Sequence, residues 1–92
     1  MRLDKYLKVS RLIKRRTVAN EVCDAGRVTI NGRPAKAGSP VAVGDTLEIL
    51  YGGRRISGEV LVVAENMRTE QAKDMFKLLK EERLPPTETE LS

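Results

Sequence analysis

The side chains in this sequence that are best suited to chemistry are cations. Residues 1–36 hold ten lysines and arginines against three acids, a net charge of +7, whereas residues 37–92 carry −3. Arginine offers a planar fork of donors that matches the oxygens of a phosphate group. The polarised charge therefore indicates a surface for a polyanion in the first part of the chain, and a simply solvated basic exterior is the weaker interpretation.

The candidate contacts to a nucleic acid flank and join the first two expected helices. They are Arg2, Arg11, Lys14, Arg15, Arg16, Arg27, Arg33 and Lys36. Arg16 and Arg2 are the first choices, because Arg16 lies with Arg15 where a helix is expected to begin, and backbone N–H groups there can add to an anion site. For Lys5, Lys8 and Lys36, a solvated side chain is an equally good interpretation.

Catalytic and metal chemistry are poorly represented in this composition. The chain has no histidine and one cysteine, Cys23, so an intramolecular disulfide and a thiolate cage for a metal are both excluded. Cys23 is expected to pack as a small core residue. Asp4 is expected to favour a helix start or pair with a nearby cation, and Tyr6 to pack in the core instead of stacking on a base. We therefore expect a binding protein without cofactor, metal or enzymatic activity.

Two short helices are expected to position the cations. Apolar residues from Leu3 to Val9 recur at helical spacing, and a basic connection follows from Arg11 to Arg16. Thr17 is a suitable N-cap for a second helix, and Gly26 is suited to end it, since glycine accepts a positive φ.

Strands follow the two helices. Alternation at Arg27–Ile30 runs into Asn31-Gly32, a pair typical of a tight turn, and further strands are expected at Thr46–Tyr51 and Arg55–Val63. Apolar residues between Thr69 and Glu82 recur every three or four positions, which predicts a C-terminal helix. The predicted fold class is α+β: two N-terminal helices packed on a small, mostly antiparallel sheet of four or five strands, with a C-terminal helix.

The expected domain plan has three parts. Residues 1–66 form an RNA-binding domain with a core module of about 1–50, residues 67–84 form a helix packed on it, and residues 85–92 form a polar, disordered tail. The longest apolar run, Val60–Ala64, is too short to cross a membrane, and the first residues lack the apolar stretch of a signal peptide. The cytosol is the expected location.

Four sequence pieces in this order resemble a known RNA-binding module, the one named for small-subunit ribosomal protein four and built on the alpha-L motif. The pieces are Arg2-Leu3-Asp4-Lys5-Tyr6-Leu7, Arg15-Arg16-Thr17-Val18-Ala19, Gly26-Arg27-Val28-Thr29-Ile30-Asn31-Gly32 and Val43-Gly44-Asp45. Each piece is weak alone, but their shared order and spacing are specific. The resemblance covers about the first fifty residues and by itself implies only RNA binding.

The rest of the chain narrows the resemblance. With the stretch Arg2–Thr17 and the closing Met75–Glu82, the sequence is similar to the RqcP (YabO) family over nearly its whole length. That similarity implies a factor of bacterial ribosome-associated quality control. It would bind the rRNA of free large ribosomal subunits that carry peptidyl-tRNA, and support alanine tailing of the stalled chain by RqcH on the same subunit. A monomer is expected.

Three alternatives remain open at this point. A heat-shock-type ribosome-recycling factor carries the same module but usually ends in a basic tail, whereas this chain ends in acid. An accessory domain of an RNA-modifying enzyme such as a pseudouridine synthase would need a catalytic domain. A DNA-binding helix-turn-helix protein is disfavoured by the strands expected directly after the second helix.

Overall fold

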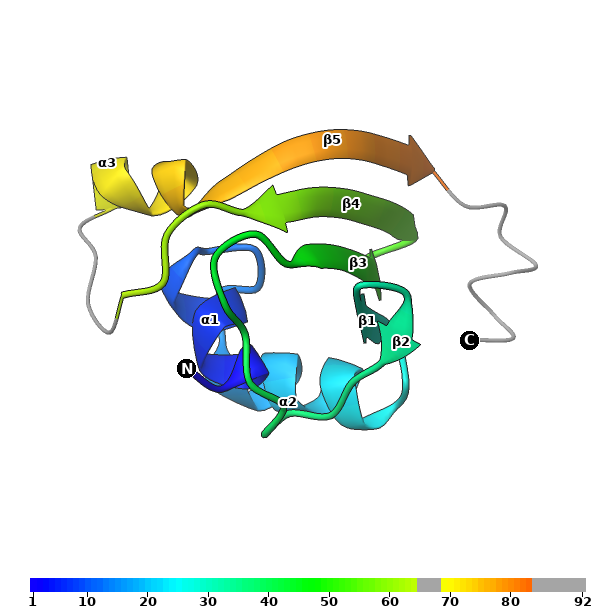
Figure 1. Ribbon diagram of the computed structural model, residues 1–92. Helices are drawn as coiled ribbons and strands as arrows, with labels where there is room; N and C mark the ends of the chain where they lie inside the picture. The colour runs from blue at the N-terminus through cyan, green and yellow to red at the C-terminus, as the bar shows by residue number, and fades with distance from the viewer. Residues whose placement is uncertain (65–68, 84–92) are drawn as a thin grey trace.

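Two helices pack on one face of a five-stranded antiparallel sheet in the computed structural model of this chain, so the expected α+β fold is confirmed in its helices and sheet (Figure 1). The structure describes residues 1–64 and 69–83. The predicted tail at 85–92 and the predicted boundary at 66/67 lie outside these residues. Strands run in the spatial order β2-β1-β3-β4-β5, so β2 and β5 form the two edges of the sheet.

Helix α1 (Leu3–Val9) forms where the apolar spacing predicts it. Leu3, Tyr6 and Leu7 are fully buried, while Lys8 is exposed. Each buried side chain of this size contributes roughly 1.5–3 kcal/mol to the free energy of folding. The helix ends at Val9. Two residues later, Arg11 has a left-handed φ of 64°, and its N–H donates to the carbonyl of Lys8 at 3.1 Å.

Helix α2 (Arg16–Asp24) begins earlier than Thr17, so the predicted N-cap is wrong. Its N-cap is Arg15, whose carbonyl accepts a hydrogen bond from Ala19 N at 3.0 Å. Because that bond closes the first turn, Thr17 already lies within the helix. At the other end Gly26 adopts a φ of 78°, as the sequence predicts.

Strands β1 (Val28–Ile30) and β2 (Arg33–Pro34) form a hairpin around the predicted Asn31-Gly32 turn, where both residues have positive φ (53° and 81°). Strand β3 (Thr46–Tyr51) pairs with β1 on one side and with β4 (Arg54–Val60) on the other. The Asn31 side chain accepts a hydrogen bond from Thr46 N at 2.9 Å. The turn is thereby fixed to the start of β3.

The predicted C-terminal helix is wrong for most of its length. Only one turn, α3 (Thr69–Ala72), is helical, followed by a 3₁₀ turn, η1 (Lys73–Met75), and by an eight-residue strand, β5 (Phe76–Arg83). Strand β5 pairs antiparallel with β4 from Val60↔Phe76 to Arg54↔Arg83. Pairing along all of β4 outweighs the good intrinsic helix propensity of Lys, Leu and Glu in this stretch.

The core lies between the helices and the sheet, and residues from both ends of the described chain meet in it. Tyr6 from α1 is fully buried, and its hydroxyl donates to the carbonyl of Met75 at 2.7 Å, which confirms that Tyr6 packs in the core. Burial raises the pKa of this phenol. Cys23 is also fully buried, as expected.

Candidate RNA-binding surface

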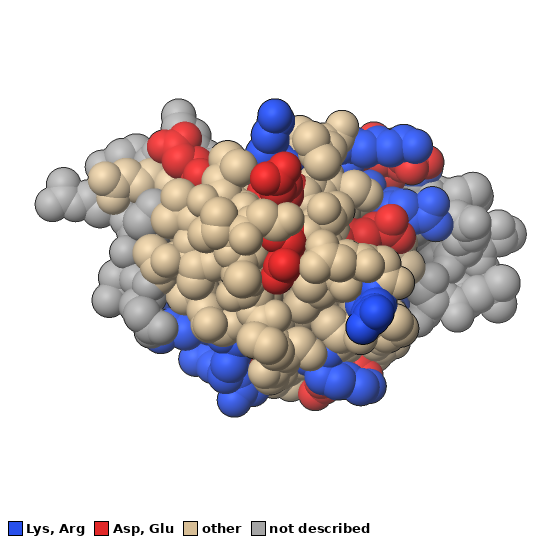
Figure 2. Space-filling view, in the orientation of Figure 1, with Lys and Arg blue, Asp and Glu red and all other residues tan. Residues whose placement is uncertain are grey.

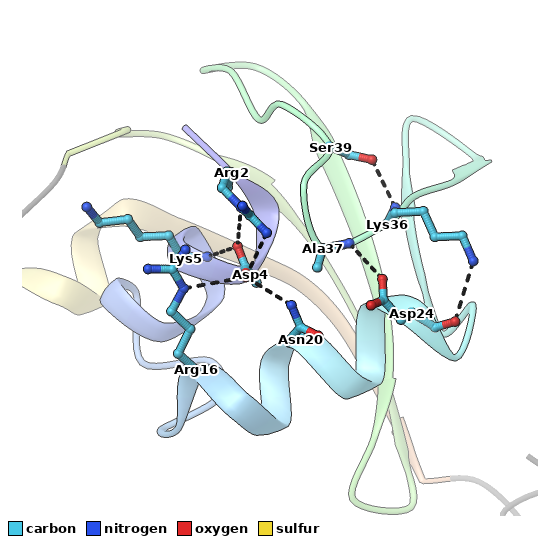
Figure 3. Close-up of polar contacts among 9 residues, drawn as sticks. All are labelled: Arg2, Asp4, Lys5, Arg16, Asn20, Asp24, Lys36, Ala37 and Ser39. Carbon is cyan, nitrogen blue, oxygen red and sulfur yellow. Dashed lines mark hydrogen bonds and ion pairs between the residues drawn. The ribbon is translucent and has the colours of Figure 1, made fainter.

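A buried carboxylate organises the amino-terminal cations. Asp4 is 2% exposed and accepts hydrogen bonds from Lys5 N (2.8 Å) and from the side-chain amide of Asn20 (3.3 Å). Two guanidinium groups reach it from two sides: Nε of Arg2 lies 3.2 Å from Oδ1, and Nε of Arg16 lies 3.4 Å from Oδ2 (Figure 3). The expectation that Asp4 pairs with a nearby cation is confirmed.

The Asp4 carboxyl remains charged in this position. Burial raises its pKa, but the Asn20 amide, the Arg16 charge, the Lys5 N–H and the Arg2 charge together lower it further, so its pKa lies below the usual value of 3.8. A carboxylate with several hydrogen bonds and two ion pairs is stabilised in this way. Asp4 therefore acts as a fixed negative point that holds both arginines.

The two arginines are held without being covered. Their side chains are 55% and 47% exposed for Arg2 and Arg16, against 2% for Asp4. Arg2 contacts Asp4 through Nε and Nη2, and Arg16 through Nε. Nη1 of Arg2 and both Nη groups of Arg16 take no part in these contacts with Asp4, so they can meet an external anion.

The surface is a shallow depression of about 460 Å³ between the helices and the loop that follows β2. It is lined by Met1, Arg2, Lys5, Arg16, Gly38 and Pro40. We call Arg2, Lys5 and Arg16 the arginine surface. Lys5 was not among the predicted contacts, and its position one turn from Arg2 on α1 was the available signal.

Backbone hydrogen bonds fix the start of the chain against that loop. Leu3 N donates to the carbonyl of Ser39 at 2.9 Å, Asp4 N to that of Ala37 at 3.1 Å, and Val41 N to that of Met1 at 2.9 Å. Arg2, the residue between Met1 and Leu3, is therefore part of a rigid backbone and not of a mobile arm. Rigid presentation reduces the conformational entropy lost on binding.

The remaining predicted contacts lie elsewhere on the molecule. Lys14 and Arg15 are exposed just before α2, next to Arg16 in the chain. Arg11 lies beyond the other end of α1 and lines a second pocket. Three further cations follow the end of α2 in the chain: Arg27, Arg33 and Lys36. The Lys36 ammonium contacts the carbonyl of Asp24 at 3.4 Å.

Charge is unevenly distributed over the visible face of the molecule. Figure 2 shows lysines and arginines along the lower margin, where α1 and α2 lie in Figure 1, and acids across the middle and upper parts, over the strands. Cations of the β4–β5 region are interleaved with these acids, as in the Arg54–Glu81 ion pair. On this face, the lower margin thus shows mainly cations, although cations also lie at its upper and right margins.

Other chemistries find little support among residues 1–64 and 69–83. No group of three His, Cys, Asp or Glu side chains in these ranges is arranged to hold a metal ion. Nor do these residues include a helix that is long and apolar enough to cross a membrane.

Comparisons with known proteins define the class. Residues 1–47 match the family model described as "S4 domain". The solved structure of heat shock protein 15 from Vibrio cholerae, described as trimeric, superposes with a TM-score of 0.80 at 25% identity, covering 86% of this chain and 81% of that one. The family match and the fold together are those of an S4-domain protein.

Full-length relatives narrow the class. The RQC P-site tRNA stabilizing factors of Halalkalibacterium halodurans and Bacillus subtilis are each 51% identical, over 96% and 91% of this chain and 100% and 98% of theirs. A heat shock protein 15 homologue from Aeromonas salmonicida is 32% identical, over 75% of this chain and 52% of that protein. This chain belongs to the family of RQC P-site tRNA stabilizing factors, and the family resemblance inferred from the sequence is confirmed.

Proposed function

We propose that this chain stabilises P-site tRNA during ribosome-associated quality control, and that the arginine surface is its principal contact with RNA. One observation carries the assignment to this surface: a single buried carboxylate, Asp4, presents two half-exposed guanidinium groups side by side. The names of the full-length relatives support the biological role.

The proposed mechanism is positional. Arg2 and Arg16 pair with phosphate oxygens of folded RNA, which proteins recognise largely through its backbone and shape. Bridging large-subunit rRNA and peptidyl-tRNA would hold the tRNA in place while RqcH, on the same subunit, supports the addition of another alanine. The chain makes no covalent bond in this scheme and needs no cofactor.

The other predicted cations extend the contact in this proposal. Lys14 and Arg15 continue it along the connection before α2, while Arg27, Arg33 and Lys36 continue it past the far end of α2. We propose further that the chain acts as a monomer in the cytosol, with one copy on each subunit.

Co-sedimentation with purified large ribosomal subunits that carry peptidyl-tRNA tests the proposal. Arg16→Ala should remove the protein from the subunit fractions, since it deletes one of two paired phosphate contacts. Arg83→Ala is the matched control, because it removes an exposed arginine on β5, away from the arginine surface, and should leave sedimentation unchanged. Circular dichroism checks that both variants are folded.

The salt dependence of binding separates phosphate contact from an indirect effect. Each lost phosphate contact lowers the slope of log affinity against log salt by about 1. Arg16→Ala should lower this slope and Arg83→Ala should not. Equal binding of Arg16→Ala and the unsubstituted protein at every salt concentration would remove Arg16 from the site.

The heat-shock-type recycling alternative shares the fold but fits the chain less well. The Vibrio cholerae structure establishes the common architecture. The chain is, however, more similar to the P-site tRNA stabilizing factors, for example 51% identical over 96% of its length to that of Halalkalibacterium halodurans. To the Aeromonas salmonicida homologue it is 32% identical over 75% of its length. We therefore retain P-site tRNA stabilisation as the proposed function.

A further inference from the structure

A second pocket lies at the opposite end of α1 from the arginine surface. Its volume is about 370 Å³, and we call it the Phe76 pocket. It is lined by Ser10, Arg11, Leu12, Arg54, Ile56, Ala72, Phe76, Leu78 and Glu81. Three of these residues follow the end of α1, and the others come from α3 and from strands β4 and β5, which lie beyond the 1–47 range of the S4 match.

Apolar side chains form the inner wall of the Phe76 pocket. The Phe76 ring lies over Gly58, so closely that a β-carbon at that position would fall 2.3 Å from the ring. Leu12 and Ile56 are half-buried, and Leu78 remains 54% exposed. Such a wall suits a flat apolar group with a polar edge, because it offers van der Waals contact without hydrogen-bond requirements of its own.

Charged groups form the rim. Arg54 is paired with Glu81 across β4 and β5, and Arg11 projects from the turn that ends α1. With two arginines and one glutamate, the rim carries a net charge of +1. An anionic group attached to a flat apolar one matches this combination of rim and wall.

The backbone at Arg11 is unusual for its residue type. Its φ of 64° lies in the left-handed region, which favours glycine or asparagine, and an arginine there costs on the order of 1 kcal/mol. With this backbone conformation, Arg11 lines the Phe76 pocket. Because glycine accepts this φ, Arg11→Gly would remove the side chain without straining the backbone.

We propose that the Phe76 pocket holds one unstacked nucleotide of the bound RNA, with its base against Leu78 and Phe76 and its phosphate near Arg11. This inference rests on the proposed function. The two sites are the two ends of α1, a helix about 10 Å long. A single strand that rises about 3.4 Å per stacked nucleotide covers this distance in a few nucleotides.

Adjacent leucines on β5 provide a matched test of the occupant. Leu78, which is 54% exposed, lines the Phe76 pocket, whereas Leu79, which is 56% exposed, does not. The photocrosslinker p-benzoylphenylalanine is placed at position 78 or 79 of the full chain, and each protein is irradiated on large subunits that carry peptidyl-tRNA. A crosslink to one RNA nucleotide from position 78, absent from position 79, is the expected result.

Three results would overturn the proposal: a position-78 crosslink to protein, equal RNA crosslinks from both positions, or no crosslink from a protein that still co-sediments. A second variant pair guards against disturbance by the bulky probe. Leu78→Asn should weaken subunit binding roughly 5-fold or more, the effect of losing the apolar contact of one base, and Leu79→Asn should not. Equal affinity of the two variants would also overturn it.

The outcome is distinguishable from failure of the proposed function. If the unsubstituted chain does not bind the subunits at all, the proposed function fails. If it binds, and depends on Arg16, but positions 78 and 79 behave alike, only the nucleotide pocket is wrong.

Discussion

Substitution of Asp4 by asparagine distinguishes two roles for the buried carboxylate. Asparagine keeps the size of the side chain but removes the charge that Arg2 and Arg16 contact at 3.2 and 3.4 Å. If Asp4 merely reduces the positive potential, its loss should strengthen RNA binding. If Asp4 positions the arginines, its loss should weaken binding.

The magnitudes favour weakening. Removing one negative charge about 7 Å from a phosphate gains roughly 0.6 kcal/mol in water, and less in salt. Two released arginines must be immobilised again on binding, at about 0.5–1.5 kcal/mol each. The net loss is about 0.5–2.5 kcal/mol, so Asp4→Asn should bind RNA several-fold to tens of fold more weakly.

The assay is a titration of large subunits that carry peptidyl-tRNA, repeated at several salt concentrations. The slope of log affinity against log salt should stay unchanged in Asp4→Asn, because the same arginines still reach the RNA. Thermal unfolding is measured in parallel, since loss of the charged hydrogen bonds to Asp4 is expected to lower stability by about 1–3 kcal/mol. Tighter binding by a folded Asp4→Asn protein would refute the positioning role.

Three further predictions follow from described contacts. The pKa of Asp4 is lower in the folded than in the unfolded chain, so the charged carboxylate stabilises the fold fully above the usual value of 3.8, and this stabilisation is lost as pH falls through the folded value. The urea concentration at the unfolding midpoint should therefore fall less steeply with decreasing pH in Asp4→Asn than in the unsubstituted protein. Gly58→Ala should cost about 1–3 kcal/mol in urea unfolding, because the new β-carbon would lie 2.3 Å from the Phe76 ring and 2.4 Å from the Lys77 carbonyl oxygen, whereas Ser57→Ala should cost much less. Burial and the charges of Asp4 and Asp24 raise the pKa of Cys23 from 9.0 to about 11. At pH 8 the folded protein should therefore react with iodoacetamide at least about 100-fold more slowly than the urea-unfolded chain. Similar rates in the two states would contradict a buried thiol.

Local sequence signals predict the amino-terminal half well. Helix α1, the stop at Gly26 and the turn at Asn31-Gly32 each follow from side-chain spacing or from a residue that accepts positive φ. These features depend on contacts within a few residues. The family pattern in the first fifty residues rests on the same local features, which explains its agreement with the S4 match.

The carboxy-terminal half depends on a distant partner. Residues Phe76–Arg83 carry good helix formers with apolar residues at suitable spacing, yet they form β5. The deciding interaction is the ladder to β4, whose paired residues lie from 16 (Val60↔Phe76) to 29 (Arg54↔Arg83) positions earlier in the chain. Periodicity within one segment contains no information about that ladder.

The sequence predicted which cations could belong to the candidate site, but not which of them lie together or what holds them in place. Arg2 and Arg16, the first choices from the sequence, line the same depression, whereas Arg11 lines a different pocket. That Arg2 and Arg16 bind RNA stays a prediction. The joining residue, Asp4, was recognised only as a partner for some cation, and Asn20 was missed. The Asn20 contact spans sixteen residues between two helices, so it follows from helix packing and not from spacing along the chain.

The bond from the Tyr6 hydroxyl to the Met75 carbonyl joins residues 69 positions apart and crosses the end of the S4 match at residue 47. A fragment cut there would leave β3 two residues long and would uncover Tyr6. We therefore expect that residues 1–47 do not fold stably on their own. Transfer of Arg2 and Arg16 to another protein would therefore require that β4 and β5 are transferred as well.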